Sequence, residues 1–123
     1  MTQKKLLIVD DDELSRITLV ELLLREGFDA TAAADGFQAL KDFEASPCHL
    51  ALVDLMMPGM DGIELLERLK EKDPKLPVII MTAHNEIHAY LRAKEKGAFE
   101  YLIKPVDFDI LRQMLSTIFS PDD

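Results

Sequence analysis

Short apolar runs alternate along the whole chain with longer segments that have helical periodicity. Three runs, residues 5–10, 50–54 and 77–82, are almost continuously hydrophobic, which is typical of strands that are buried on both faces of a parallel sheet. Residues 99–104 form a fourth run. The fifth, residues 29–34, reads DATAAA and has low strand propensity, so we expect it at an edge of the sheet.

The segments between these runs carry apolar residues at the spacing of α-helices. Residues that favour helix ends flank them: Gly27, Pro74 and Gly97 follow three of the segments, and Asp107 precedes the last. The expected helices span residues 13–26, 36–45, 62–72, 86–96 and 108–119. The apolar face of the last helix is expected to hold Ile110, Leu111, Met114, Leu115 and Ile118.

Five strand–helix pairs with short connections predict right-handed crossovers and therefore an α/β fold with a doubly wound, five-stranded parallel sheet. The chain has 123 residues, the size of one domain, so we expect a single domain over residues 1–123. In such sheets ligands bind outside the carboxyl ends of the strands. Residues at the strand ends are therefore the first candidates for chemistry.

Charge and composition exclude several classes of protein. The formal net charge is -9 and the pI is near 4.7, which argues against direct binding of nucleic acid or of an anionic membrane surface. No apolar run approaches the roughly 20 residues of a membrane span, and the N-terminal apolar run is too short for a signal-peptide core. Cys48 is the only cysteine, which excludes an internal disulfide and suits the reducing cytoplasm.

Acidic residues, a threonine and a lysine stand at the ends of the expected strands: Asp10–Asp12, Asp54, Thr82 and Lys104. If these ends meet at one edge of the sheet, the carboxylates repel one another unless a cation neutralises them. Mg²⁺ fits best, because it takes a few carboxylates, keeps waters and bridges to phosphate oxygens. Lys104 and Thr82 supply a positive charge and a hydroxyl donor for an oxyanion. The pattern therefore predicts a phosphoryl group carried on an aspartate.

Four stretches in order, IVDDDELSR, LVDLMMPGMDG, MTAH and GAFEYLIKP, resemble the receiver domain of two-component response regulators. The resemblance covers essentially the whole chain, and four motifs at this spacing are very specific. It implies a CheY-like, flavodoxin-like (βα)5 fold with strand order 2-1-3-4-5. The sequence after MTAH is similar to that of receivers of the nitrogen-regulation type. Those receivers usually precede an ATPase domain and a DNA-binding domain, so a C-terminal output domain is an expected neighbour in a longer protein.

The resemblance also implies roles for the acidic residues. Asp54 would be the phospho-acceptor. Asp10 and Asp11 would bind Mg²⁺ together with Asp54, and Met56 would contribute its backbone carbonyl to the metal. Three acids follow the first strand where two would suffice, and the separation from Arg16 favours the first two, which leaves Asp12 as a helix cap.

The remaining roles concern the phosphoryl group and the switch. By resemblance, Thr82 and Lys104 would contact the phosphoryl group. Tyr101 would be the switch aromatic and would move together with Thr82. The Lys104–Pro105 bond is typically cis in this family. His84 lies two residues after Thr82, and our hypothesis is that it influences the rate of dephosphorylation.

These features together predict a phosphorylation switch and not an enzyme that turns over external substrates. The expected partner is a sensor histidine kinase or a histidine phosphotransfer protein that docks on residues 13–26. The readout surface would combine the fourth helix, the fifth strand and the fifth helix, and receivers of this type dimerise on activation in some cases. The domain would assist its own phosphotransfer and its own slow dephosphorylation.

Each candidate residue also has a plainer interpretation. Asp10–Asp12 could be turn and cap residues, which we favour for Asp12 alone. Lys104 could be an ordinary surface lysine, Thr82 a helix cap and Tyr101 a core aromatic.

Three alternative functions remain at this stage. An aspartate-nucleophile phosphohydrolase needs a second acid two residues after Asp54, where this chain has Met56. A flavodoxin-type protein needs amide and hydroxyl donors after the first strand, where three acids would repel the phosphate of FMN. An interaction module that acts without phosphorylation would not require the pocket residues, all of which are present.

Overall fold

The computed structural model describes residues 3–83 and 87–120. Within these residues, five parallel strands form one sheet in the order β2-β1-β3-β4-β5, which confirms the expected fold and strand order. The strands are β1 (Lys5–Val9), β2 (Asp29–Ala33), β3 (Leu50–Asp54), β4 (Val78–Thr82) and β5 (Glu100–Ile103). The weakly apolar β2 lies at one edge, as expected, and β5 lies at the other.

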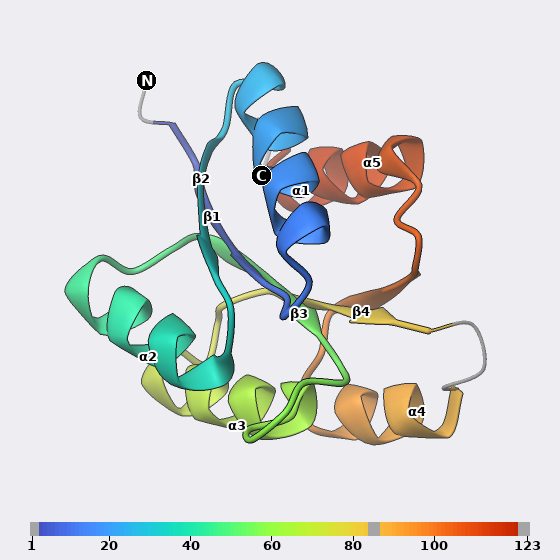
Figure 1. Cartoon of the computed structure of the whole chain (residues 1–123). Helices are drawn as coiled ribbons and strands as arrows, with labels where there is room; N and C mark the ends of the chain where they lie inside the picture. Colours follow the sequence, from blue (N-terminus) through green and yellow to red (C-terminus); the bar gives the residue numbers. More distant parts are fainter. Residues whose placement is uncertain (1–2, 84–86, 121–123) are drawn as a thin grey trace.

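Helices cover both faces of the sheet (Figure 1). They are α1 (Glu13–Arg25), α2 (Gly36–Ala45), α3 (Gly62–Lys72), α4 (Ile87–Glu95) and α5 (Phe108–Ile118). Alternate residues of each central strand point to opposite faces. Leu7 and Val53 therefore belong to a core with α2, α3 and α4, whereas Leu6 and Leu52 belong to a core with α1 and α5. Because both faces are covered, β3 and β4 are buried along their whole length.

Aspartates begin four of the helices. The side chain of Asp12 accepts a hydrogen bond from the amide of Ser15, and Asp107 does the same for Asp109 and Ile110. Asp35 and Asp61 cap α2 and α3 in the same way. Such caps satisfy amides that have no partner within the helix. They confirm the capping roles expected for Asp12 and Asp107, and they place each helix start just beyond the carboxyl end of a strand.

The apolar face of α5 differs from the expectation. Ile110 was expected on the buried face of α5, but it is 46% exposed, and Leu111 and Leu115 form the buried stripe. The side chain of Ile110 instead lines an open hollow beside β5, together with Tyr101 and Ile103. No helix within the described residues is long and apolar enough to span a bilayer.

Candidate functional site

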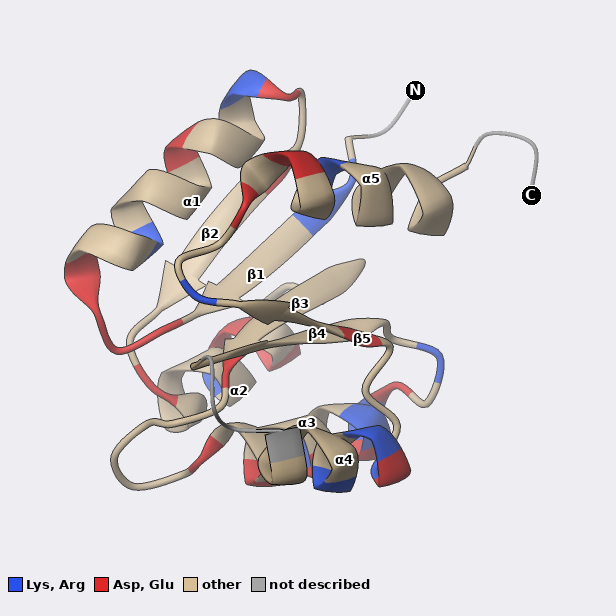
Figure 2. Cartoon of the chain, turned by 90° about the vertical axis from the view of Figure 1, so that its right-hand side faces the viewer, with Lys and Arg blue, Asp and Glu red and all other residues tan. Residues whose placement is uncertain are grey.

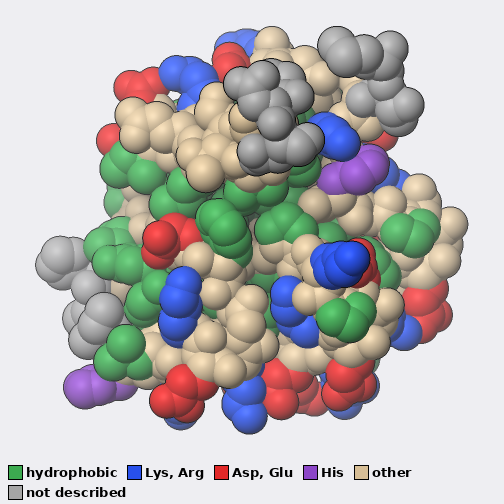
Figure 3. Space-filling view, turned by 180° about the vertical axis from the view of Figure 1, so that it is seen from behind, with side chains coloured by type: hydrophobic (Ala, Val, Ile, Leu, Met, Phe, Trp, Pro, Cys, Tyr) green, Lys and Arg blue, Asp and Glu red, His purple; other side chains and the backbone are tan. Residues whose placement is uncertain are grey.

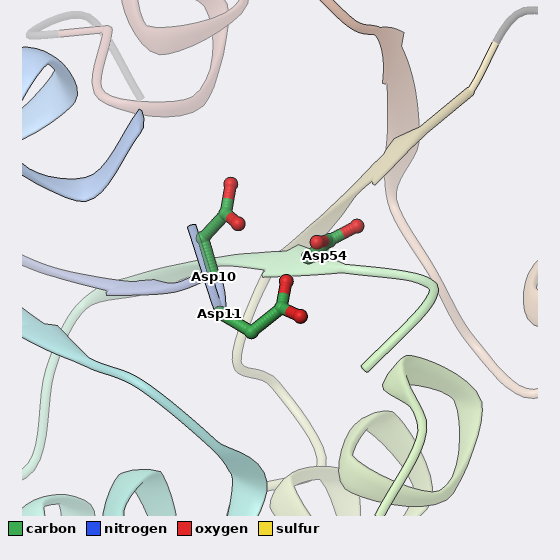
Figure 4. A group of neighbouring side chains, drawn as sticks. All are labelled: Asp10, Asp11 and Asp54. Carbon is green, nitrogen blue, oxygen red and sulfur yellow. The ribbon is translucent and has the colours of Figure 1, made fainter. Parts of the chain in front are cut away.

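Three carboxylates meet at the carboxyl edge of the sheet. Asp10 follows β1 and Asp54 ends β3, and the two strands pair directly, with Val9 opposite Val53. Asp11 extends from the loop after β1, where consecutive acidic residues colour the ribbon red in Figure 2. One oxygen from each of the three carboxylates lies within 4.8 Å of the others (Figure 4). The structure therefore brings together the three acids that the sequence singled out.

Lys104 is the cation of this cluster. Its Nζ lies 2.9 Å from Asp10 Oδ2 and 3.4 Å from Asp54 Oδ2. The Lys104 amide donates to the carbonyl oxygen of Thr82 at 2.8 Å, which ties the loop after β5 to the end of β4. The Lys104–Pro105 peptide is cis, as the resemblance implied. Lys104 is thus a residue of the cluster and not an ordinary surface lysine.

Asp10 and Asp12 have different surroundings, although they are close in sequence. Asp10 is completely buried, its Oδ1 accepts from the Asp12 amide at 2.9 Å, and its carbonyl oxygen accepts from Arg16 Nη1 at 2.8 Å. Asp12 is exposed, and its Oδ2 accepts from both the amide and the hydroxyl of Ser15. The two hydrogen bonds from Ser15 lower the pKa of Asp12. Asp12 therefore belongs to the helix cap.

Burial and charge shift the pKa of the groups in the cluster. Burial raises the pKa of Asp54 to about 6, and the nearby charge of Asp10 adds to the rise, while Lys104 opposes it. For Lys104, burial lowers the pKa, but the hydrogen bond to Asp10 and the charges of both aspartates outweigh it, so the net shift is upward. A single lysine therefore does not compensate fully for the acids, and the cluster favours further positive charge.

The donor set suits Mg²⁺. Magnesium prefers six oxygen ligands at about 2.1 Å, so ligands on opposite sides of the ion are about 4.2 Å apart. The carboxylate oxygens all lie within 4.8 Å of one another, so an inward shift of the side chains would bring them around one ion. Asp11 is exposed, which leaves room for waters on the ion. Met56, which is 61% exposed, donates its amide to Asp54 Oδ1 at 3.4 Å, and the expected contribution of its carbonyl to a metal stays a prediction.

A comparison with known protein families matches residues 6–116 to the response regulator receiver domain. The chain belongs to this family. The receiver domain is 44% identical over 112 residues to sporulation initiation phosphotransferase F of Bacillus subtilis (strain 168), an alignment that covers 91% of this chain and 90% of that protein. It is 42% identical over 102 residues to the DNA-binding transcriptional regulator NtrC of Escherichia coli (strain K12), covering 83% of this chain.

The same alignment spans only 22% of the length of NtrC. Among solved structures, a two-component response regulator from Clostridium difficile superposes with a TM-score of 0.92 at 26% identity, covering 98% of this chain and 99% of that one. These matches confirm the resemblance to receiver domains of two-component systems. The receiver domain is therefore similar both to a protein of about its own length and to a part of a much longer regulator.

The two residues expected to act as the switch, Thr82 and Tyr101, lie on neighbouring strands, at the end of β4 and within β5. Thr82 is buried at the end of β4, one residue beyond the position that pairs with Asp54, and its hydroxyl donates to the carbonyl oxygen of Ala83 at 3.3 Å. Tyr101 lies on β5, and its ring packs against the ring of Tyr90 with the centroids 4.1 Å apart. His84 lies outside the described residues.

Gly62 is a site residue of the receiver domain that the sequence reasoning missed. Its amide donates to the carbonyl oxygen of Leu55 at 2.9 Å, which closes the loop between β3 and α3. A Cβ at Gly62 would collide with the carbonyl oxygen of Asp54 and lie 2.8 Å from the Cα of Leu55. Only glycine lets the start of α3 approach the backbone of Asp54 this closely. The DG pair after MMPG was a signal, but it predicts a turn equally well.

Proposed function

We propose that this receiver domain is a phosphorylation switch in which Asp54 accepts a phosphoryl group from a phosphohistidine. The donor would be a sensor histidine kinase or a histidine phosphotransfer protein. The observation that carries the proposal is the convergence of Asp10, Asp11 and Asp54 at one edge of the sheet, with Lys104 in ionic contact with two of them. A phosphoryl acceptor needs positioning and charge neutralisation more than covalent machinery.

In the transfer step, a carboxylate oxygen of Asp54 attacks the phosphorus, the phosphorus–nitrogen bond breaks, and its electron pair returns to the imidazole of the donor. Bound Mg²⁺, held by the three aspartates and the Met56 carbonyl, would neutralise the charge of the phosphoryl oxygens. Lys104 would exchange its contact with Asp54 for a phosphoryl oxygen while it keeps Asp10. The Thr82 hydroxyl, which now donates to Ala83, would turn towards another phosphoryl oxygen.

The surface around α1 fits a docking partner. A cavity of about 250 Å³ lies between α1 and the segment that follows Lys104, and Asp10 is part of its lining. Leu14 and Ile17 are exposed on the same helix, although large apolar side chains there gain nothing from contact with water. A helix of the donor that occupied this groove would hold its phosphohistidine beside the acidic cluster.

The readout surface would comprise α4, β5 and α5. Hydrophobic side chains gather over β5 between α5 and α4 (Figure 3). The exposed large apolar residues of these elements and of the turn before β5 are Leu91, Phe99, Ile103 and Ile110. Tyr101 belongs to the same surface, so a change in its ring position would alter what a partner meets. A second phosphorylated copy of the domain would bind here, or an output domain, since relatives such as NtrC are much longer than the aligned region.

The site supports a switch better than a phosphohydrolase. Met56 stands where a hydrolase of this chemistry needs its second acid, so the position that would protonate a leaving alcohol has no acidic group. The aspartyl phosphate would therefore persist until water hydrolyses it slowly, with the domain assisting only that step. Turnover of phosphate monoesters by the purified protein would contradict this assignment.

The test is labelling by acetyl phosphate in the presence of Mg²⁺, followed by intact-protein mass spectrometry. The wild-type domain should gain one phosphoryl group, Asp54→Asn should gain none, and EDTA should abolish the reaction. Asp12→Asn is the matched control, since its side chain caps α1 and Asn is an equally good cap; it should be labelled normally. Full labelling of Asp54→Asn would show that another residue is the acceptor.

A further inference from the structure

Three residues form a second polar cluster away from the acidic site, at the edge of the sheet beside α4. Tyr90 of α4 and Tyr101 of β5 hold their rings 4.1 Å apart at an angle of 42°. The Tyr90 hydroxyl donates to Glu100 Oε1 at 3.4 Å, and the Tyr101 amide donates to the same oxygen at 3.1 Å. One carboxylate oxygen therefore joins a helix to the backbone of a strand.

The cluster lies at the free edge of the sheet. Among the residues that the structure describes, β5 pairs with β4 alone, and the strand alternation places Glu100 and Tyr101 on opposite faces. The Glu100 carboxylate must therefore reach around the edge to meet both the Tyr101 amide and the Tyr90 hydroxyl. Burial raises the pKa of Tyr90, and the charge of Glu100 and the hydrogen bond to it add to the rise, so the hydroxyl remains a donor.

The ring of Tyr101 has room on one side and a neighbour on the other. It lines an open hollow of about 610 Å³ together with Ile103 and Ile110, and the ring of Tyr90 contacts it from α4. The contact between the two rings stabilises their present position, since aromatic pairs contribute more than the area that they bury. Any rotation of Tyr101 away from α4 must break this contact.

We infer that Tyr90 is a positioning residue that, through Glu100, holds Tyr101 and α4 in the unphosphorylated arrangement. This inference rests on the proposed function, because it concerns the regulation of the same switch. Phosphorylation would have to overcome the contact, so Tyr90 and Glu100 set how much of the domain is switched at a given level of phosphorylation. Removing the hydroxyl should change the ratio of the two ring positions about fivefold in favour of the switched one.

The chain contains only two tyrosines, which makes a direct test practical. Protein labelled with 3-fluorotyrosine gives one fluorine resonance from each, and Tyr90→Phe leaves the resonance of Tyr101 alone. Wild-type protein with Mg²⁺ and beryllofluoride supplies the position of the Tyr101 resonance in the switched state, and Tyr101→Phe assigns the two resonances. In Tyr90→Phe without these additions, the Tyr101 resonance should move towards that reference position.

Glu100→Gln is the second variant, because it keeps both tyrosines and weakens only the acceptor. It should move the Tyr101 resonance in the same direction, whereas Glu95→Gln, which removes a charge from α4 outside the cluster, should leave it in place. Thermal unfolding checks that each variant is folded. A Tyr101 resonance that stays at its wild-type position in either Tyr90→Phe or Glu100→Gln, or that moves away from the reference, would overturn the inference.

A purely structural role, in which Glu100 protects the sheet edge, predicts lower stability of the variants without movement of the Tyr101 resonance. Failure of the proposed function is distinguishable from failure of this inference. If the proposed function were wrong, the wild-type resonances would not respond to Mg²⁺ and beryllofluoride at all, and the acetyl phosphate experiment would show no labelling of Asp54.

Discussion

The ammonium group of Lys104 lies 2.9 Å from a carboxylate oxygen of Asp10, 94 positions earlier in the chain. The Asp10 side chain is completely buried, and an isolated charge there would be strongly destabilising. The ion pair therefore joins the end of β1 to the loop after β5 in the absence of metal. It also neutralises part of the charge of the acidic cluster, so the cluster can fold without a bound cation.

Replacing Lys104 by Met should destabilise the metal-free protein. The substitution leaves Asp10 and Asp54 without their cation, and we expect the free energy of unfolding to fall by about 2 kcal/mol, because partial exposure of the lysine screens the full cost of a buried unpaired charge. Urea denaturation in EDTA measures the loss. Mg²⁺ should restore part of it, since the ion then replaces the missing positive charge. Lys41→Met, on the exposed side of α2, is the control and should change little.

Asp54→Asn should stabilise the metal-free protein at neutral pH. The pKa of Asp54 is raised from 3.8 to about 6, so the folded state binds more protons than the unfolded state between these values. Stability therefore falls as the pH rises through this window, and the penalty is complete above it. Removing the carboxylate should increase the free energy of unfolding by about 2 kcal/mol at pH 7.5. The gain should shrink towards zero as the pH approaches 4.

Urea titrations of the two proteins in EDTA across this pH range test the prediction. A gain that is constant with pH would mean that the Asn substitution acts through packing and not through the charge of Asp54. Added Mg²⁺ should reverse the order of stability, because the wild type binds the ion more tightly than the variant.

Asp11→Asn and Asp12→Ala should separate metal binding from capping. Asp11 is in the carboxylate cluster, so its replacement should weaken Mg²⁺ binding roughly tenfold or more and leave the thermal unfolding midpoint in EDTA nearly unchanged. Asp12 caps α1, so its replacement should lower that midpoint by roughly 4 °C and leave the Mg²⁺ affinity nearly unchanged. Mg²⁺ titrations and thermal scans measure both quantities. The reverse pattern would exchange the roles of the two residues.

The fold could be predicted from the sequence because its strongest signals are local. The runs at residues 50–54 and 77–82 are apolar throughout, since both faces of β3 and β4 are covered by helices. Residues 62–72 were predicted as a helix and form α3 with the same bounds, because Pro74 forbids much further extension. The convergence of Asp10, Asp11 and Asp54 follows from the rule that parallel strands end at one edge.

Features that depend on packing between elements could not be predicted. Ile110 lines an open hollow beside β5, and the helical periodicity of α5 does not predict that placement. The contact between Tyr90 and Tyr101 depends on the placement of α4 against the edge strand. The close approach of Gly62 to Asp54 depends on the path of the loop between β3 and α3. Each is a relation between elements and has no periodic signal.

Gly62→Ala should disturb the acidic site although it adds only a methyl group. The added Cβ would collide with the backbone of Asp54 and Leu55, which cannot move as a flexible side chain can. The start of α3 must then move away from β3, and we expect a loss of about 3 kcal/mol in the free energy of unfolding and weaker Mg²⁺ binding.

Gly27→Ala is the matched control. Gly27 has a φ of 93° but no atom within 4 Å of an added Cβ, so it tests backbone strain without a collision. This control should lose about 1 kcal/mol and keep its Mg²⁺ affinity, because Gly27 lies at the opposite end of α1 from Asp11. If Gly62→Ala lost stability but bound Mg²⁺ as the wild type does, the close approach of α3 would serve the fold alone. Loss of both would show that the same contact holds Asp54 in the position from which it binds the ion.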